Sequence, residues 1–339
     1  MQRCLSLARL GAGNVAPNPM VGAVLVYNNR IIGEGYHKEY GKAHAEVNCI
    51  NSVSEADKPL IAQSTMYVSL EPCAHHGKTP PCADLIIEKK IAIVIVGCRD
   101  SYEEVNGRGI EKLKAAGVNV IVGALEKECL DLNKRFFTFY TKHRPYIILK
   151  WAQTKNGKIA NSDYSKLAIS NEQTNRLVHK WRSEEVAIMI GTNTALQDNP
   201  SLTTRLVPGN NPIRLVIDMD LKLPTTLNLF DGSVRTIVFN RIKHSDEAVF
   251  YYKIENGIES ILKALYHLRI QSVLIEGGAK LLQSFIDTGN WDEARMITNT
   301  ELEIENGIAA PILKKEKLNL TESIISDSID YYTKSKTNE

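Results

Sequence analysis

The feature that most constrains this chain is a set of three potential metal ligands in two separate segments. His44 opens the segment His44-Ala-Glu46, and Cys73 and Cys82 enclose a loop that ends in Pro80-Pro81. One imidazole and two thiolates can hold a single ion only if the fold brings these segments together. Three protein ligands are typical of catalytic zinc, which keeps its fourth position for water and lowers the pKa of that water.

The residues around these ligands indicate hydrolytic chemistry. Glu46 lies two residues after His44, close enough to take a proton from the water and pass it to a leaving amine. We expect His44 to open one helix and Cys82 to lie in the first turn of another, where a helix N-terminus favours a thiolate. A histidine, a glutamate and two cysteines form the signature of zinc deaminases. We therefore predict His44, Cys73 and Cys82 as zinc ligands and Glu46 as a catalytic acid–base.

Two other kinds of zinc protein remain open at this point. A structural zinc site usually has four protein ligands, and Cys98 could supply the fourth. A zinc-stabilised nucleic-acid-binding module would carry a strongly basic surface, whereas 41 Lys and Arg against 39 Asp and Glu give a formal net charge of only +2.

The six cysteines are scattered, and no apolar run approaches the ~20 residues of a membrane span. We expect a cytoplasmic protein with reduced thiols and with neither nucleic acid nor membrane as a partner.

The length and the pattern of segments predict two α/β domains. Domains usually contain about 100 to 200 residues, and this chain has 339. Strand-like and helix-like segments alternate in the first part, as in a three-layer α/β domain, and the pattern restarts after the polar segment Thr141–Pro145. We place the domains at residues 1–143 and 144–339. We also expect a single helix from Glu126 to about Tyr140 and a loosely ordered polar tail from about Asn319.

Four segments of the first half resemble a known family. They are Ala16-Pro-Asn-Pro-Met-Val-Gly-Ala-Val24, Gly33-Glu-Gly-Tyr-His37, His44-Ala-Glu46 and Leu70-Glu-Pro-Cys-Ala-His-His-Gly-Lys-Thr-Pro-Pro-Cys82. They are similar to bacterial bifunctional riboflavin biosynthesis proteins of the diaminohydroxyphosphoribosylaminopyrimidine deaminase and aminouracil-phosphoribosyl reductase type. The last segment is the most specific, because eight residues separate its cysteines where cytidine and tRNA adenosine deaminases have C-x-x-C. An insert that carries cations suits a phosphorylated substrate.

The resemblance implies both a fold and a pair of reactions. It implies a cytidine-deaminase-like first domain and a dihydrofolate-reductase-like second domain. The first reaction would be zinc-dependent deamination of 2,5-diamino-6-ribosylamino-4(3H)-pyrimidinone 5′-phosphate, and the second NADPH-dependent reduction to 5-amino-6-ribitylaminouracil 5′-phosphate. An alternative is a zinc deaminase with a single activity, on a nucleobase, a nucleotide or tRNA, and a non-catalytic second domain. The family also suggests a homo-oligomer, either a dimer or a tetramer. The substrate-binding residues implied in the first domain are Asn18, His37, His76 and Lys78.

Three segments of the second half also resemble this family. They are Leu149–Ile159, Ile190–Arg205 and Val273–Gly278. The last reads as a strand, a diglycine turn and a helix start, where backbone amides and the helix dipole can face the pyrophosphate of a nucleotide. It is not G-x-G-x-x-G, so we do not predict a Rossmann domain.

The resemblance assigns roles to individual residues of the second half. Lys150 is a candidate catalytic residue for substrate or proton handling, and Arg205 is a candidate phosphate clamp because a guanidinium presents a fork of donors. The family often has Trp-Ile-Thr where this chain reads Ala168-Ile-Ser170, so a stacking aromatic is missing from the expected cofactor site. The implied substrate contacts are Arg182, Leu202, Arg205 and Glu276, and the implied cofactor contacts are Gln153, Ala168, Thr194, Asp198, Gly277 and Gly278.

Overall fold

The computed structural model describes residues 1–75, 80–100, 106–246, 249–255, 257–314 and 316–335. The chain divides into two compact units, Met1–His143 and Arg144–Glu339. Each unit has its own central sheet. No helix among the described residues is long and apolar enough to cross a membrane.

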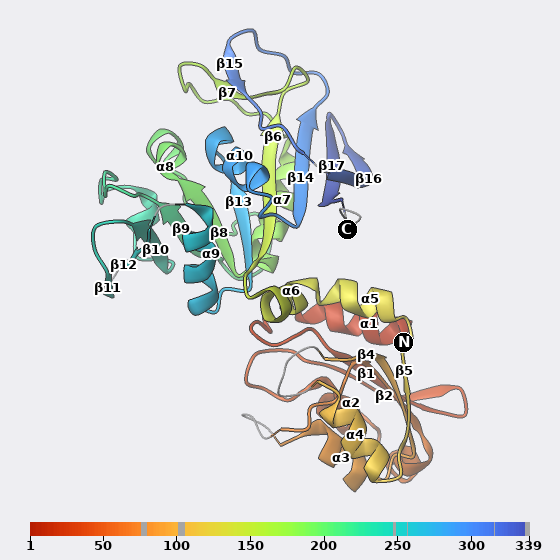
Figure 1. Ribbon diagram of the computed structural model, residues 1–339. Helices are drawn as coiled ribbons and strands as arrows, with labels where there is room; N and C mark the ends of the chain where they lie inside the picture. Colours follow the sequence, from red (N-terminus) through yellow and green to blue (C-terminus); the bar gives the residue numbers. More distant parts are fainter. Residues whose placement is uncertain (76–79, 101–105, 247–248, 256, 315, 336–339) are drawn as a thin grey trace. The chain divides into compact units, whose positions relative to one another are not determined.

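The first unit is a three-layer α/β structure around a five-stranded sheet of order β2-β1-β3-β4-β5. Helices α1, α5 and α6 cover one face, and α2, α3 and α4 cover the other (Figure 1). Strand β1 is antiparallel to β2 and β3, while β3, β4 and β5 are parallel. The strands are β1 (Gly22–Tyr27), β2 (Arg30–Tyr36), β3 (Thr65–Leu70), β4 (Ile93–Cys98) and β5 (Asn119–Val122). The helices are α1 (Gln2–Ala8), α2 (Ala45–Asn51), α3 (Cys82–Glu88), α4 (Arg108–Ala115), α5 (Glu126–Leu132) and α6 (Lys134–Lys142), with 3₁₀ turns at Arg9–Gly11 and Lys58–Gln63.

Local sequence explains how the potential metal ligands are presented. His44 is the N-cap of α2, Cys82 is the first residue of α3 after Pro81, and Cys73 follows the carboxyl end of β3. A proline at the start of a helix is favourable because its missing N–H would have no partner there. Helices α2 and α3 share one buried apolar cluster on the same face of the sheet, through Ala45, Cys49, Ile50, Ala83 and Ile86. Burial of these apolar side chains therefore brings the two ligand-bearing helix starts together.

The single helix expected from Glu126 to about Tyr140 is two helices, and that prediction was wrong. Asn133 separates α5 from α6 with φ −105° and ψ 23°. Its buried side chain accepts from the Met20 backbone N–H at 2.8 Å and donates to the Met20 carbonyl at 2.9 Å. The break between the two helices therefore lies at a residue whose side chain is held by a segment remote in sequence. The two bonds fix the loop that contains Asn18.

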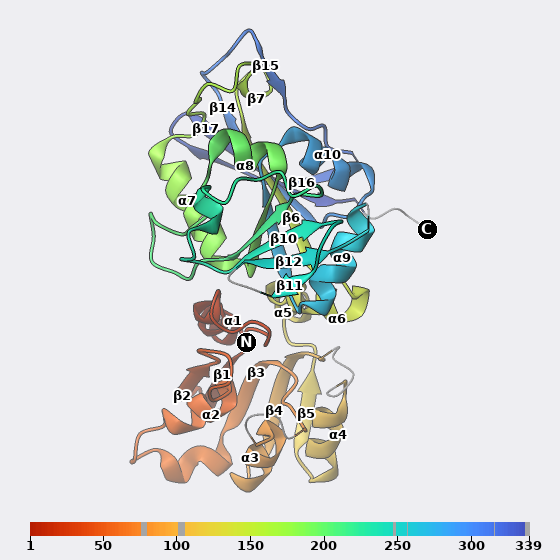
Figure 2. The same cartoon turned by 90° about the vertical axis from the view of Figure 1, so that its left-hand side faces the viewer.

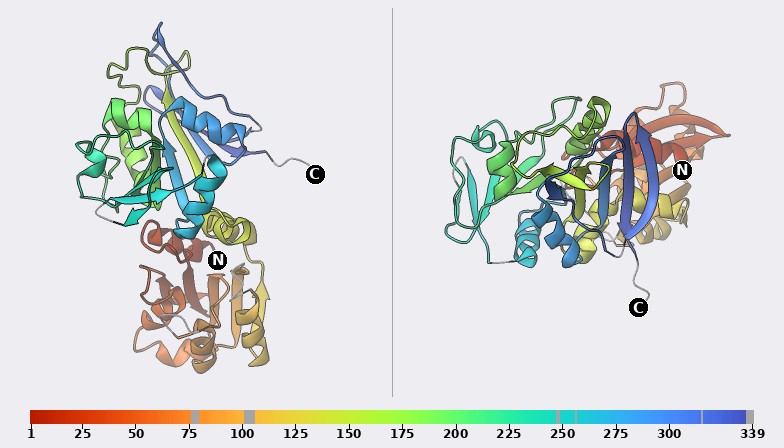
Figure 3. Two further views of the ribbon diagram at one scale, coloured as in Figure 1. Left: turned by 60° about the vertical axis from the view of Figure 1, so that its left-hand side comes forward. Right: turned by 90° about the horizontal axis from the view of Figure 1, so that it is seen from above.

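The second unit is built on a ten-stranded sheet of order β11-β12-β10-β9-β8-β13-β6-β14-β17-β16. Helices α7 and α8 lie over one face of it (Figure 2), and α9 and α10, cyan and blue in Figure 3, lie over the other. The central strands from β12 to β14 are parallel, and both edges are antiparallel. The helices are α7 (Glu172–Glu184), α8 (Thr192–Asp198), α9 (Ile258–His267) and α10 (Ala279–Asp287), with a 3₁₀ turn at Asn228–Phe230. The sheet strands are β6 (Tyr146–Gln153), β8 (Ala187–Gly191), β9 (Ile213–Ile217), β10 (Thr236–Asn240), β11 (Ser245–Asp246), β12 (Phe250–Lys253), β13 (Ser272–Glu276), β14 (Glu293–Asn299), β16 (Glu316–Ile324) and β17 (Asp327–Lys334), and a separate pair is formed by β7 (Lys158–Asn161) and β15 (Gly307–Ala309).

Most of the segment from Asn319 to residue 335 forms regular strands, and the loose tail expected from about Asn319 was wrong for these described residues. Strands β16 and β17 form an antiparallel hairpin, and β17 pairs with β14 along its length. Ile329 of β17 is fully buried against α7 and the sheet. Buried and half-buried side chains alternate at the start of β17, where only one face needs apolar residues, whereas β16 is exposed along nearly its whole length.

Candidate functional site

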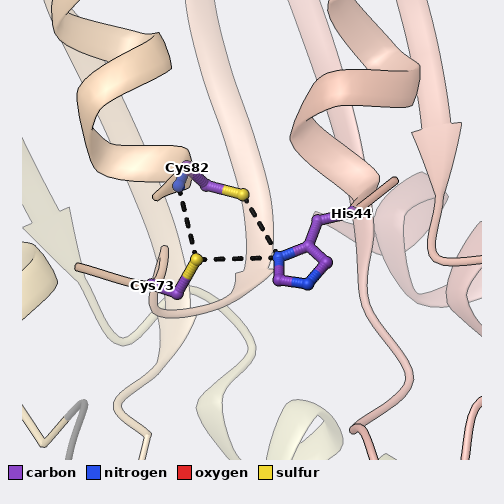
Figure 4. A group of neighbouring side chains, drawn as sticks. All are labelled: His44, Cys73 and Cys82. Carbon is purple, nitrogen blue, oxygen red and sulfur yellow. Dashed lines mark hydrogen bonds between the residues drawn. The ribbon is translucent and has the colours of Figure 1, made fainter. Parts of the chain in front are cut away.

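Three potential ligands converge in the first unit (Figure 4). His44 Nδ1 lies 3.6 Å from Cys73 Sγ and 3.4 Å from Cys82 Sγ. The Cys82 backbone N–H donates to Cys73 Sγ at 3.3 Å. The three candidate ligand atoms all lie within 4.8 Å of one another. The fold therefore brings together the two segments that the sequence separates.

This geometry fits a zinc ion. A tetrahedral site with Zn–N of about 2.0 Å and Zn–S of about 2.3 Å has N···S edges of roughly 3.5 Å, close to the two distances above. One imidazole and two thiolates are also a typical zinc donor set. Cys98, considered as a fourth ligand, instead lies 3.6 Å from the Ser69 carbonyl oxygen. Across the described part of the chain, the only group of side chains placed to hold a metal is His44, Cys73 and Cys82.

Glu46 lies in the first turn of α2 beside this cluster. Its side chain is buried, with only 3% of the residue exposed. Burial raises the pKa of Glu46, Cys73 raises it further, and His44 opposes the shift. A divalent cation between the thiolates would favour the ionised carboxylate. The arrangement can hold a metal ion and place a carboxyl group within reach of a water molecule next to it.

Asn18 and His37 form a chain of hydrogen bonds that leads to the cluster. His37 Nδ1 lies 3.1 Å from the Ala43 carbonyl oxygen, and His37 Nε2 lies 3.1 Å from Asn18 Nδ2. Because a carbonyl oxygen can only accept, Nδ1 carries the proton, and Nε2 accepts from Asn18. Burial lowers the pKa of His37, which agrees with a neutral ring. The His37 ring meets the His44 ring edge-on, with centroids 5.2 Å apart.

Glu71 is a residue of this site that the sequence reasoning missed. It follows β3, is 4% exposed, and lies two residues before Cys73. A carboxylate that accepts several amide hydrogens holds the segments that donate them in one position. Glu71 thus fixes the loop bearing Cys73 against the start of α4. The available signal was an acidic residue inside the most specific segment. Its donors, at 2.9 to 3.2 Å, are the backbone N–H groups of Asp100, Gly107, Gly109 and Ile110.

A cavity of about 500 Å³ in the second unit contains a second set of predicted residues. Its walls come from β6, α7, α8 and the end of β13. Gln153 and Arg205 do not line it. The Gln153 side chain accepts from Trp151 Nε1 at 2.9 Å and donates to Thr298 Oγ1 at 3.3 Å. The predicted residues that line the cavity are Lys150, Ala168, Arg182, Thr194, Asp198, Leu202, Glu276, Gly277 and Gly278.

Three charged side chains meet in the wall of this cavity. Arg182 donates to both oxygens of Glu276, from Nε at 2.9 Å and from Nη2 at 2.7 Å, and Lys150 Nζ lies 3.8 Å from the same carboxylate. Burial alone would raise the pKa of Glu276, but Arg182 and Lys150 lower it to about 2. Burial lowers the pKa of Lys150, and Glu276 opposes this shift. The group combines a permanently ionised carboxylate with an ammonium group whose proton is easier to remove than usual.

The diglycine turn also borders this cavity. Gly277 and Gly278 have φ values of 84° and 71°, which favour glycine. A Cβ atom at Gly277 would lie 2.9 Å from Thr194 Cγ2, and one at Gly278 would lie 3.0 Å from Thr194 Oγ1. The turn leads into α10, so its backbone amides and the helix start face the cavity together. The absence of side chains at these two glycines lets Thr194 pack directly against the turn.

Comparison with known proteins places both units in one family. Residues 145–300 match the family described as the RibD C-terminal domain, and residues 1–98 match the cytidine and deoxycytidylate deaminase zinc-binding region. A riboflavin biosynthesis protein RibD from Aquifex aeolicus is 40% identical over 302 residues, which cover 86% of this chain and 83% of that protein. The chain belongs to the RibD family. RibD from Escherichia coli is 32% identical over 314 residues, which cover 86% of this chain and 84% of that protein.

Solved RibD structures extend the match to nearly the whole fold. The Thermotoga maritima diaminohydroxyphosphoribosylaminopyrimidine deaminase/5-amino-6-(5-phosphoribosylamino)uracil reductase has a TM-score of 0.92 and 37% identity, with 98% of this chain and 97% of that chain covered. Acinetobacter baumannii RibD has a TM-score of 0.90 and 28% identity, with 99% of this chain and 98% of that chain covered.

Membership of the RibD family confirms the main predictions from the sequence. The protein is a bifunctional riboflavin biosynthesis enzyme with a zinc-binding deaminase domain and an NADPH-dependent reductase domain, and the predicted pair of folds is correct. The alternative with a non-catalytic second domain is disfavoured, because that half of the chain matches the RibD C-terminal domain. Among the predicted deaminase residues, His76 and Lys78 lie outside the described residues, and the others lie at or next to the metal cluster.

Proposed function

We propose that residues 1–143 deaminate 2,5-diamino-6-ribosylamino-4(3H)-pyrimidinone 5′-phosphate, and that residues 144–339 reduce the product to 5-amino-6-ribitylaminouracil 5′-phosphate. The observation that best supports this proposal is the convergence of His44, Cys73 and Cys82 beside the buried carboxyl of Glu46. The name of the Thermotoga maritima relative describes the same pair of activities. The cavity with Lys150 and Glu276 provides a second, separate place for the reduction.

In the proposed deamination, this chain's residues hold the metal and move one proton. His44, Cys73 and Cys82 would bind zinc, which when bound acts as a Lewis acid and lowers the pKa of water. Glu46 takes a proton from the water that adds to C2 of the pyrimidine and returns a proton to the departing amine. Water is consumed and ammonia is released, so the step balances as a hydrolysis. The substrate would be oriented by Asn18, His37, His76 and Lys78.

In the proposed reduction, NADPH when bound supplies a hydride to C1 of the ring-opened ribosylamine. The C1–N imine takes the hydride at carbon and a proton at nitrogen. Lys150 donates that proton, because it is an ammonium group in the cavity wall with a lowered pKa. Glu276 would hold Lys150 in place through the ion pair at 3.8 Å, and Arg182, Glu276, Leu202 and Arg205 would contact the substrate. NADPH would be held by Gly277, Gly278, Thr194, Asp198 and Ala168 in the cavity wall. Gln153 lies outside this wall, with its side chain bonded to Trp151 and Thr298.

The proposal extends to the setting in which the enzyme works. Both reactions use small phosphorylated molecules, so we propose a cytoplasmic enzyme with no nucleic-acid or membrane partner. We also propose a homo-oligomer, a dimer or a tetramer. Light scattering coupled to gel filtration measures the mass of the particle, and a mass equal to one 37.8 kDa chain would contradict the oligomer.

A single assay tests the two activities. The purified protein is incubated with the diamino substrate, with and without NADPH, while ammonia release and NADPH absorbance are followed. We expect ammonia in both samples and NADPH consumption only after deamination has begun. Ammonia release with no NADPH consumption would support the single-activity alternative. If the deaminated substrate also fails to oxidise NADPH, the proposed reductase function is wrong.

Removal of zinc is expected to separate the two activities. A chelator that strips the metal should reduce deamination to the background rate, because His44, Cys73 and Cys82 alone provide no activated water. NADPH oxidation with the deaminated substrate should continue at its original rate, since the residues proposed for the reduction lie in the second unit. Metal analysis and both rates are measured before and after chelation, and restored zinc should restore deamination. An equal loss of both activities would contradict this separation.

The substitution Gly277→Ala tests the proposed cofactor turn. The new Cβ would lie 2.9 Å from Thr194 Cγ2 at a φ of 84°, so the turn must shift. We expect KM for NADPH to rise about tenfold, with deamination unchanged. Gly232→Ala is the matched control, because Gly232 has a φ of 74° but no atom within 4 Å of its Cβ position. Equal KM values for NADPH in the two variants would argue against contact between this turn and the cofactor.

A further inference from the structure

The loop of residues 202–211 connects the cavity wall to strand β9 and contains two predicted substrate contacts. Leu202 is buried and lines the cavity with a φ of 51°, which is unusual for a leucine. A residue held in this region of φ carries strain that the surrounding contacts have to maintain. The loop is closed on itself, since Thr204 N–H donates to Asn211 Oδ1 at 2.8 Å and Thr204 Oγ1 donates to the Asn210 carbonyl at 3.0 Å.

Helix α7 holds this loop through hydrogen bonds. The Arg205 backbone N–H donates to His179 Nδ1 at 2.9 Å, and Arg182 Nη1 donates to the Thr203 carbonyl at 3.3 Å. His179 and Arg182 are three residues apart and therefore lie on the same face of the helix. Arg182 also pairs with Glu276, so the same helix face is tied to the reductase cavity.

Close packing adds a further contact on this face. Gly209 passes so near α7 that a Cβ atom there would lie 2.5 Å from Ser183 Cβ, with a φ of 149° at the glycine. Ser183 is four residues after His179, again on the same side of the helix. Helix α7 therefore contacts the loop at Thr203 and Arg205 on one side and at Gly209 on the other. His179 supplies the acceptor for the Arg205 backbone N–H.

The protonation state of His179 allows it to accept the hydrogen bond from the Arg205 backbone N–H. Nδ1 can accept from the Arg205 amide only when the ring is neutral with its proton on Nε2. Burial lowers the pKa of His179, and the cations Arg182, Arg205 and Lys150 lower it further, to about 4, although Glu276 opposes them. The ring is consequently neutral at the pH at which most enzymes work, and Nδ1 can then accept from the Arg205 amide.

We propose that His179 is a positioning residue of the reductase, whose Nδ1 fixes the backbone of Arg205 so that the Arg205 guanidinium faces the phosphate of the substrate. The Arg205 side chain is exposed, and its Nη1 donates to Thr203 Oγ1 at 2.8 Å, which leaves further donors for a phosphate monoester. His179 does not line the cavity and so acts through the loop. This inference rests on the proposed reductase function, within which it names the residue that sets recognition of the phosphate.

Two substitutions of nearly equal shape test the proposal. His179→Asn places an amide oxygen close to the position of Nδ1 and keeps an acceptor, whereas His179→Leu has a similar shape and no acceptor. We expect His179→Leu to raise KM for the deaminated phosphorylated substrate about tenfold, with kcat and KM for NADPH little changed. His179→Asn should recover most of the wild-type KM. Deamination should be the same in all three proteins.

A second measurement does not depend on turnover. Hydrogen exchange, followed by mass spectrometry on peptides covering residues 203–211, reports whether the Arg205 amide is protected. We expect faster exchange in His179→Leu and near wild-type exchange in His179→Asn, with equal melting temperatures as the check on folding. The proposal is overturned if His179→Leu keeps the wild-type KM, or if both variants lose affinity equally. If the wild type fails to oxidise NADPH, the proposed function fails, and the exchange data still decide whether His179 holds the loop.

Discussion

Replacing Glu46 by glutamine is expected to lower the rate of deamination by about 10²- to 10⁴-fold, while zinc remains bound. Glutamine has nearly the same shape as glutamate but cannot take a proton from water or return one to the amine. His44 and Cys82 should keep their positions, because His44 is the N-cap of α2 and Cys82 begins α3. The variant should therefore bind the metal and lack the step that Glu46 performs.

The experiment compares three proteins in three measurements. Zinc content and ammonia release are measured for the wild type, Glu46→Gln and Glu55→Gln, the last because the Glu55 side chain is 88% exposed, whereas Glu46 is buried. Glu55→Gln should behave as the wild type. Reduction of the deaminated substrate should be equal in all three. Ammonia release near the wild-type rate from Glu46→Gln would remove this residue from the reaction, and loss of zinc would show that its role is structural.

If Lys150 donates the proton to nitrogen, replacing Lys150 by methionine should lower kcat for the reduction by about 10²- to 10⁴-fold. This is the range expected for deamination by Glu46→Gln. Methionine keeps most of the apolar stem and has no proton to give. The fold should survive, since Arg182 remains bound to both oxygens of Glu276 and the carboxylate keeps a partner. Deamination and KM for NADPH should change little.

Two further variants separate proton donation from simple charge. Lys150→Arg keeps a cation in the cavity wall, but a guanidinium does not release its proton at ordinary pH, so kcat should remain low. Lys155→Met is the neutral control, because the Lys155 side chain is 59% exposed. If Lys150→Arg restores kcat, Lys150 contributes charge and not a proton. A wild-type rate in Lys150→Met would exclude both roles.

The pH dependence of the wild type provides an independent check. A proton donor works only in its protonated form. The reduction should therefore run at its full rate below the pKa of Lys150 and slow down as the pH rises through that pKa. Burial lowers that pKa from the usual 10.5 of a lysine, and the loss should therefore begin at a lower pH than for an exposed lysine. Lys150→Arg should lack this decline on the alkaline side.

The zinc site could be predicted from short segments of the sequence. His44, Glu46, Cys73 and Cys82 lie in short segments whose residue types and spacing are specific to the reaction, so the sequence alone predicted a zinc deaminase. The helix starts at His44 and Cys82 also follow from local rules. The diglycine turn at the end of β13 was predicted for the same reason.

Contacts between distant segments could not be predicted in this way. The helix break at Asn133 lies where its amide bonds to Met20, 113 residues away, and β17 becomes a strand because β14 offers it an edge. Glu71 and His179 act on backbone N–H groups of residues that are remote in sequence, and a backbone amide carries no side-chain signature that marks it as a partner. Residue types and spacing determine which chemistry a chain can perform, whereas the supports that hold those residues in place depend on which backbone groups the folded chain brings within hydrogen-bonding distance.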